Sequence, residues 1–224
     1  MAERDLDASL LRYTGTGVVG QVEYAVRSDR RWLTLRLGGA IGTLRSTLTQ
    51  VDGLPQQRTR STWVELEYMR RLNARHQRTR LYFGGFLAAR ATGIIHLYSV
   101  PANNGAYVFQ RVWLGPLVTI DRPIGPKHSL TARLGVPVLA VIGRPYGTLH
   151  GTSIPLLIPH LPLKVSGLPT FLAGDFALSY SARFRGTSSV VIGHHLSVEH
   201  YRGSHGVRIG SQDISVAMRF GGTP

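Results

Sequence analysis

The chain has 224 residues, a formal net charge of +14 and no cysteine, and only 17% of its residues are charged against 43% that are hydrophobic. The lack of cysteine excludes a disulfide framework, a cysteine zinc site and a thiol nucleophile. The charged fraction lies below the roughly 25% usual for soluble domains. No run approaches the ~20 apolar residues of a membrane helix, so this chain could cross a membrane only with strands.

Alternation of apolar and polar residues recurs along the chain, and each such run predicts a β-strand with two different faces. The clearest run, residues 171–185, sets Phe176 and Leu178 on one face and Asp175 and Arg183 on the other. Ten strands are predicted in this way. In chain order they cover residues 6–13, 17–27, 32–42, 63–69, 80–90, 109–120, 130–142, 171–185, 189–200 and 212–220.

Two of these predicted strands contain an internal proline, Pro116 in 109–120 and Pro137 in 130–142. Proline cannot donate to the hydrogen-bond ladder and is at home only at edges or bulges, so an irregularity is predicted at both positions. In 130–142 the alternation places Leu134 and Ile142 on the apolar face, opposite Arg133.

The connections between the predicted strands alternate in length. Short ones cover residues 28–31, 72–78, 121–128 and 185–188, whereas long ones cover 45–61, 91–105 and 144–170. This rhythm predicts an all-β, up-and-down antiparallel meander that closes into a barrel of about ten strands, with eight to twelve as the range. We expect a single domain over 1–224, with disorder in 1–5 and a long, apolar, proline-rich loop over 144–170.

The residues on the polar face indicate whether that face lines the interior of the barrel or lies on its outside. It carries nearly balanced acids and bases, with tryptophans among them, and charges that leave water need partners. The opposite face is almost wholly apolar and suits hydrocarbon. The sequence therefore predicts a transmembrane barrel with an interior charge network made of Glu23, Arg36, Glu65, Glu67, Arg111, Arg133, Asp175, Arg183, Asp213 and Arg219.

These features together resemble bacterial outer-membrane β-barrel proteins. The resemblance covers most of residues 6–220 and includes a last strand that ends in an aromatic residue, Phe220, followed by four more residues. It implies an outer-membrane location, short turns in the periplasm and long loops outside. The N-terminus has no apolar signal-peptide core, so a signal peptide is expected to have been removed. The expected partners are the lipid bilayer, lipopolysaccharide and other membrane or periplasmic subunits.

One stretch, 194–200, suggests a different function. His195, Ser197 and Glu199 would share one strand face, and a base, a nucleophile and an acid within reach of one another can carry out acyl transfer. The stretch is similar to the His-x-Ser of outer-membrane lipid A deacylases, although Val198 stands where that family has Asn. An outer-membrane lipid A or acyl-ester hydrolase is therefore the alternative function, and a soluble ligand-binding barrel is the second alternative.

No cofactor, metal or nucleic acid is expected. Neighbouring histidines such as His194 and His195 point to opposite faces of a strand and cannot share a metal without distortion. Twelve of the 26 basic residues gather on the short-turn side, but the arginine-rich segment 70–80 lacks the interleaved aromatic residues that stack on bases. Anionic headgroups or a periplasmic partner suit that basic rim better.

The loop 144–170 is too apolar for an ordinary external loop. Its prolines keep it extended, and its large aliphatic residues would be an aggregation hazard in water unless covered. The loop is expected either to close the barrel mouth or to contact a neighbouring subunit. We expect a structural or partner-binding subunit of a membrane assembly, without a wide pore. The partner contact is predicted at Ile154, Leu156, Leu157, Ile158, Leu161 and Leu163.

Overall fold

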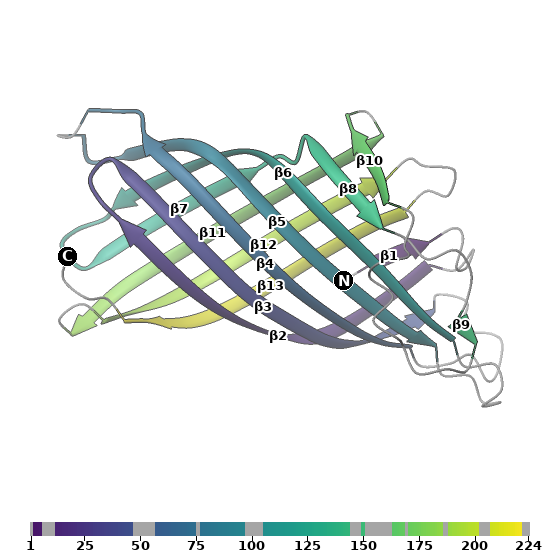
Figure 1. Ribbon diagram of the computed structural model, residues 1–224. Coiled ribbons are helices and arrows are strands. Elements are labelled where there is room, and N and C mark those ends of the chain that lie inside the picture. Colours follow the sequence, from purple (N-terminus) through teal and green to yellow (C-terminus); the bar gives the residue numbers. More distant parts are fainter. Residues whose placement is uncertain are drawn as a thin grey trace.

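The structure is a computed structural model that describes residues 2–5, 12–46, 57–74, 77–96, 105–143, 149–150, 163–168, 170–185, 188–201 and 207–220. Strands are the only regular elements in this part of the chain, and they form one antiparallel sheet (Figure 1). Their bounds are β1 Ala2–Asp5, β2 Arg12–Arg27, β3 Arg31–Ser46, β4 Gln57–Arg71, β5 Arg80–His96, β6 Gly105–Pro123, β7 His128–Gly135, β8 Leu139–Gly143, β9 Leu149–His150, β10 Leu163–Gly167, β11 Phe171–Arg185, β12 Ser188–Tyr201 and β13 Val207–Arg219.

The long strands follow one another around a curved wall. β2 to β6 pair in chain order, and β6 then pairs with β7, which pairs with β11, followed by β12 and β13. The predicted all-β, up-and-down antiparallel architecture is confirmed. The short turns lie at the end of the wall where β13 ends, and the long connections lie at the other end (Figure 1). We call these the short-turn end and the long-loop end.

The strand boundaries differ from the predicted ones mainly in length. β11 has the predicted bounds, whereas β4 extends the predicted 63–69 in both directions. The predicted first strand, 6–13, lies largely outside the described residues, and its last two residues open β2. Residues Ala2–Asp5, expected to be disordered, form β1, which pairs with both β2 and β13. Local composition could not reveal this strand, because it shows no alternation and pairs through its backbone with β2 and with the distant β13.

The wall is barrel-like, but among the described residues it is not closed along its whole length, whereas the sequence predicted a closed barrel. In the described part of the chain, β1 bridges β2 and β13 only near the long-loop end, where Ala2 lies opposite Thr14 on one side and Gly210 on the other. Beyond that point no strand pairing joins β2 to β13 among the described residues. We call the gap between Thr16–Arg27 and Ser211–Arg219 the seam.

The irregularity predicted at Pro137 is confirmed, because residues 136–138 separate β7 from β8. The amide of Val136 donates to the carbonyl of Pro116 (3.1 Å) and that of Val138 to Leu114 (2.9 Å), so Pro116 faces the bulge from within β6. A Cβ on Gly115 would lie 2.1 Å from the Val136 carbonyl oxygen, so only glycine allows this approach.

The bulge also corrects one sequence prediction. An extra residue in a strand moves every later side chain to the other face. Ile142 was expected on the apolar exterior with Leu134, but it is 3% exposed and faces the interior, whereas Leu139 is exposed. β7 and β8 together fill the place of the single predicted strand 130–142.

The core lies inside the wall, and the apolar exterior is exposed. Trp32, Tyr82, Phe86 and Leu117 are buried on the inner face. The outer face carries exposed Val, Leu, Ile, Phe and Tyr side chains on every long strand, among them Leu35, Leu66, Leu87, Leu114, Leu134, Phe176, Leu196 and Val216. Among the described residues, no helix is long and apolar enough to cross a membrane.

Two adjacent glycines of β5, Gly84 and Gly85, differ in how closely neighbouring backbone approaches them. A Cβ on Gly84 would lie 1.9 Å from the Tyr68 carbonyl oxygen and 2.7 Å from the Met69 Cα, whereas on the neighbouring Gly85 the nearest atom is 3.4 Å away. We expect Gly84→Ala to destabilise the fold by about 1–3 kcal/mol, as overpacking does, and Gly85→Ala to be nearly neutral. Urea unfolding of the two variants measures this difference. Equal stabilities would contradict the close approach.

Candidate functional site

Charged side chains from nearly every strand meet inside the wall, and the largest group lies near the middle. Arg36 of β3 is its first centre. Its guanidinium lies 2.9 Å from a carboxylate oxygen of Glu23, 3.2 Å from Glu65 and 2.7 Å from Glu67. These three acids come from β2 and β4, the two strands on either side of β3. Strict alternation delivers all four side chains to the same face.

Arg133 of β7 is the second centre. Its guanidinium pairs with Glu65, Glu67 and Asp175, and so joins β4 to β11 across the interior. The Glu67 side chain is only 1% exposed. Arg36 and Arg133 thus share Glu67 and the half-buried Glu65, which offsets the mutual repulsion of the two carboxylates.

His195 continues the network on the far side. Its Nε2 lies 2.5 Å from Asp175 and its Nδ1 lies 2.9 Å from Asp213. Beyond Asp213 on the same strand, Arg219 reaches across the seam to Glu23 at 3.2 Å. The side-chain contacts therefore run from β2 through β3, β4, β7, β11 and β12 to Asp213 of β13, and a separate pair, Arg219 with Glu23, joins β13 to β2.

A second group lies toward the long-loop end. Arg111 of β6 has a fully buried side chain and lies 2.6 Å from Glu199 of β12. Arg90 of β5 lies 3.6 Å from the same carboxylate. The Arg111 guanidinium also lies over the rings of Phe109 and Trp113. Two arginines, one fully buried and one half-buried, thus share one carboxylate.

A third group lies at the short-turn end. Arg27 pairs with Asp121, donates to the Tyr82 hydroxyl at 3.1 Å and lies over the Trp32 ring. The Asp121 carboxylate also accepts from Thr131 at 3.0 Å. The predicted charge network did not include Arg27, Arg90, His195 or Asp121. The alternation places Arg27, Arg90 and His195 on the polar faces of their predicted strands, which was the signal that could have found them, whereas Asp121 was assigned to the short connection 121–128.

One predicted member lies apart from these groups. Arg183 is exposed near the short-turn end of β11, where its backbone amide donates to the Lys127 carbonyl at 2.7 Å. None of the ion pairs between described residues includes it. Alternation assigned Arg183 to the correct strand but could not show that the interior charges end before that turn.

The three residues considered for acyl transfer all lie on the inner face of β12, but they do not form a catalytic arrangement. Both ring nitrogens of His195 contact aspartates, the Ser197 hydroxyl lies 2.9 Å from that of Ser211, and Glu199 pairs with Arg111. A general base must lie within hydrogen-bond reach of its nucleophile. Within the described residues, no group of three histidines or acids is placed to hold a metal ion.

The predicted partner contact can be followed only at its end. Ile154, Leu156, Leu157, Ile158 and Leu161 lie outside the described residues. Leu163 opens β10 opposite Gly143 of β8 and is 70% exposed, and Val165 and Leu168 are also exposed. The described part of this loop therefore presents aliphatic side chains at the long-loop end.

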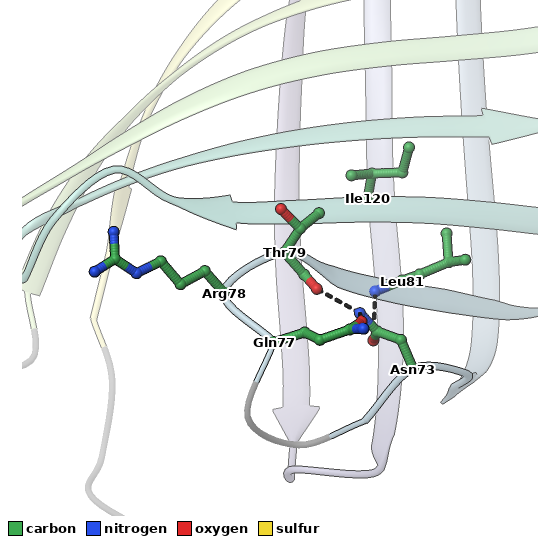
Figure 2. Close-up of a pocket in the computed structure, with 6 residues that line it drawn as sticks. All are labelled: Asn73, Gln77, Arg78, Thr79, Leu81 and Ile120. Atoms are coloured by element: carbon green, nitrogen blue, oxygen red, sulfur yellow. Dashed lines mark hydrogen bonds between the residues drawn. The ribbon is translucent and has the colours of Figure 1, made fainter.

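A shallow pocket lies at the turn between β4 and β5 (Figure 2), lined by Asn73, Gln77, Arg78, Thr79, Leu81 and Ile120. Asn73 holds this turn together. Its side chain accepts from the Leu81 amide at 3.0 Å, and its amide group donates to the Thr79 carbonyl and to Gln77. Arg78 points away from the other lining residues (Figure 2). The polar groups of this pocket thus serve the turn itself.

No protein-family model matches the sequence, and no curated protein matches it significantly.

Proposed function

We propose that the chain is an outer-membrane β-barrel protein that acts as a structural or partner-binding subunit of a membrane assembly and has no wide pore. The observation that carries this proposal is the distribution of side chains on the two faces of the wall. Charges are paired on the inside, whereas large apolar side chains such as Leu66, Leu87 and Phe176 are exposed on the outside. Lipid-facing strands have this pattern.

The same distribution argues against the soluble ligand-binding barrel. A soluble protein rarely exposes apolar patches beyond a few hundred Å², and here the exposed aliphatic side chains extend over all long strands. A barrel that binds an apolar ligand in water would carry these side chains on its inner face.

The absence of a wide pore is supported by how the interior is filled. Each strand from β3 to β6 contributes interior side chains that are almost fully buried, among them Thr34, Glu67, Tyr82, Arg111 and Leu117. An interior bounded by about eight strands is just filled by side chains, and open channels come with sixteen or more. Ion pairs across the interior also hold opposite sides of the wall together, as a structural role requires.

A role in an assembly is supported at the long-loop end. Leu163, Val165 and Leu168 are 70%, 67% and 55% exposed there, and Leu163 and Val165 lie on the short strand β10, which pairs with β8. A neighbouring subunit would cover these side chains, and the anionic headgroups of lipopolysaccharide and bilayer lipids suit the arginines at the two ends of the wall.

The membrane location is tested by site-directed spin labels, because the chain has no native cysteine. We expect a label at Phe176 or Leu134 in refolded protein to be quenched by lipid-soluble oxygen and shielded from an aqueous nickel reagent. A label at Ser179, on the inner face of β11 next to these positions, is the matched control and should lack this preference. Quenching by the aqueous reagent at Phe176 together with quenching by oxygen at Ser179 would show that the face assigned to lipid is in water, and would contradict the proposal.

A further inference from the structure

Two arginines lie directly opposite each other on the outer face of the wall, near the short-turn end. Arg31 of β3 and Arg70 of β4 are cross-strand partners, and both side chains are exposed. The residues next to them, Trp32 and Met69, are 8% and 1% exposed and face the interior, so alternation directs both arginines outward. Like charges directly opposite each other destabilise a sheet. A negative charge between the two arginines would remove this repulsion.

The described part of the chain supplies no such charge. None of the ion pairs between described residues includes Arg31, Arg70 or Asp29, the exposed acid in the turn just before Arg31. The arginines of the three interior groups each contact a carboxylate. On the long strands, as far as they are described, all acids face the interior, namely Glu23, Glu65, Glu67, Asp121, Asp175, Glu199 and Asp213.

The position of the pair along the wall matches one edge of a membrane. The outer face of β4 is uncharged between Arg60 and Arg70, which are ten positions apart. Ten residues of a strand rise about 33 Å, which is about 25 Å along the barrel axis at a tilt of about 40°. Outer-membrane barrels present an apolar band of about this height to lipid. Given the proposed function, on which this inference rests, Arg31 and Arg70 lie at the level of the lipid headgroups.

The side chains next to the pair suit a lipid. Phe83 of β5 lies directly opposite Arg70 and is 48% exposed, and Tyr68, the next outward residue of β4, is 45% exposed. Aromatic residues of this kind are enriched where a barrel wall meets the headgroup region. The shallow pocket of Figure 2 lies beside Phe83, because its Leu81 is the next outward residue of β5 and its Ile120 lies opposite Leu81. The two arginines are thus bordered by an apolar surface.

We propose that Arg31 and Arg70 bind the phosphate of an anionic phospholipid whose acyl chains lie along Tyr68 and Phe83. One phosphodiester between two guanidinium groups removes their repulsion, and the planar arginine fork matches the geometry of the phosphate oxygens. A headgroup without positive charge, such as that of phosphatidylglycerol, is favoured, because the trimethylammonium group of phosphatidylcholine would add a third cation. A free phosphate ion could make the same charge contacts but would leave Tyr68 and Phe83 uncovered.

Lipid binding to the protein in non-ionic detergent micelles tests the proposal. The probe is phosphatidylglycerol, titrated at constant detergent concentration and counted as bound adducts by native mass spectrometry. Because charge-assisted hydrogen bonds to the phosphate are lost, Arg31→Gln/Arg70→Gln is expected to bind the lipid about tenfold more weakly or worse. Phosphatidylcholine should bind the wild type about as weakly as phosphatidylglycerol binds this variant.

The matched control is Lys127→Gln/Arg183→Gln, which removes the same charge from two exposed residues at the same end of the wall. Lys127 lies in the turn before β7, and Arg183 lies in the row of β11 that contains Asp175. Neither residue is in the outward row next to Tyr68 and Phe83. Binding of phosphatidylglycerol should therefore change less than about twofold in the control.

Thermal unfolding shows whether the glutamine variant is folded. Relief of the like-charge repulsion should leave Arg31→Gln/Arg70→Gln at least as heat-stable as the wild type in lipid-free detergent. Phosphatidylglycerol should then raise the melting temperature of the wild type and of the control, but not that of the variant. A variant less stable than the wild type without lipid would contradict the unfavourable pairing of the two arginines.

Three binding results would overturn the proposal: equal weakening in the two double variants, equal binding of phosphatidylcholine and phosphatidylglycerol by the wild type, or displacement of the lipid by inorganic phosphate at the same concentration. The first would show that only net charge matters, and the last would show a site for a free anion. If binding fails while labels at Phe176 report lipid, the proposed function stands without this site. Labels at Phe176 that report water would contradict the proposed function itself.

Discussion

Replacing Glu199 with glutamine is expected to lower the free energy of unfolding by about 3–5 kcal/mol. Glu199 is the carboxylate shared by Arg111, whose side chain is fully buried, and Arg90. Removal of one member of a buried ion pair leaves an uncompensated charge, which costs several kcal/mol. In Glu199→Gln two arginines lose their counter-charge while the shape of the side chain is kept, so the loss measures charge rather than packing.

The expected loss is measured by urea unfolding in detergent, followed by the fluorescence of Trp63 and Trp113, which lie next to Arg90. Arg183→Gln is the matched control, because Arg183 is exposed, and it should change stability by less than about 0.5 kcal/mol. The double variant Glu199→Gln/Arg111→Met should recover part of the loss, since one of the two stranded charges is gone. A Glu199→Gln variant as stable as the wild type would show that water reaches this group.

Much of the inward-facing set could be predicted from the sequence, because side chains in a strand alternate with a period of two. Asp175 stands between Gly174 and Phe176 in an apolar run, and that period alone assigns it to the face that holds Arg133 and His195 in the structure. The same reasoning placed Arg36, Glu65 and Glu67 together without any knowledge of which strands pair.

The specific pairs could not be predicted in this way. Arg111 and Glu199 are 88 positions apart, and their contact depends on how β6 and β12 are placed across the interior. Ile142 was assigned to the wrong face because a bulge changes the period at one residue, and Pro137 marks only its approximate position. The seam could not be predicted, because it depends on the directions of β2 and β13 relative to each other. No local sequence pattern reports the relative direction of two distant strands.

Replacing Arg133 with methionine is the second change expected to have a large effect, again about 3–5 kcal/mol of unfolding free energy. Arg133 joins Glu65 and Glu67 to Asp175, so its loss leaves Glu65 and Glu67 with Arg36 and leaves Asp175 with His195. Unlike Glu199→Gln, this variant leaves excess negative charge, so its stability should recover as the pH falls and carboxylates become protonated. Glu199→Gln leaves excess positive charge on arginines, which acid cannot neutralise, and should show no such recovery. Urea unfolding of both variants between pH 5 and pH 8, each relative to wild type at the same pH, separates the two cases. A parallel pH response of the two variants would mean that their losses come from packing, and the interior would then be held by shape rather than by paired charge.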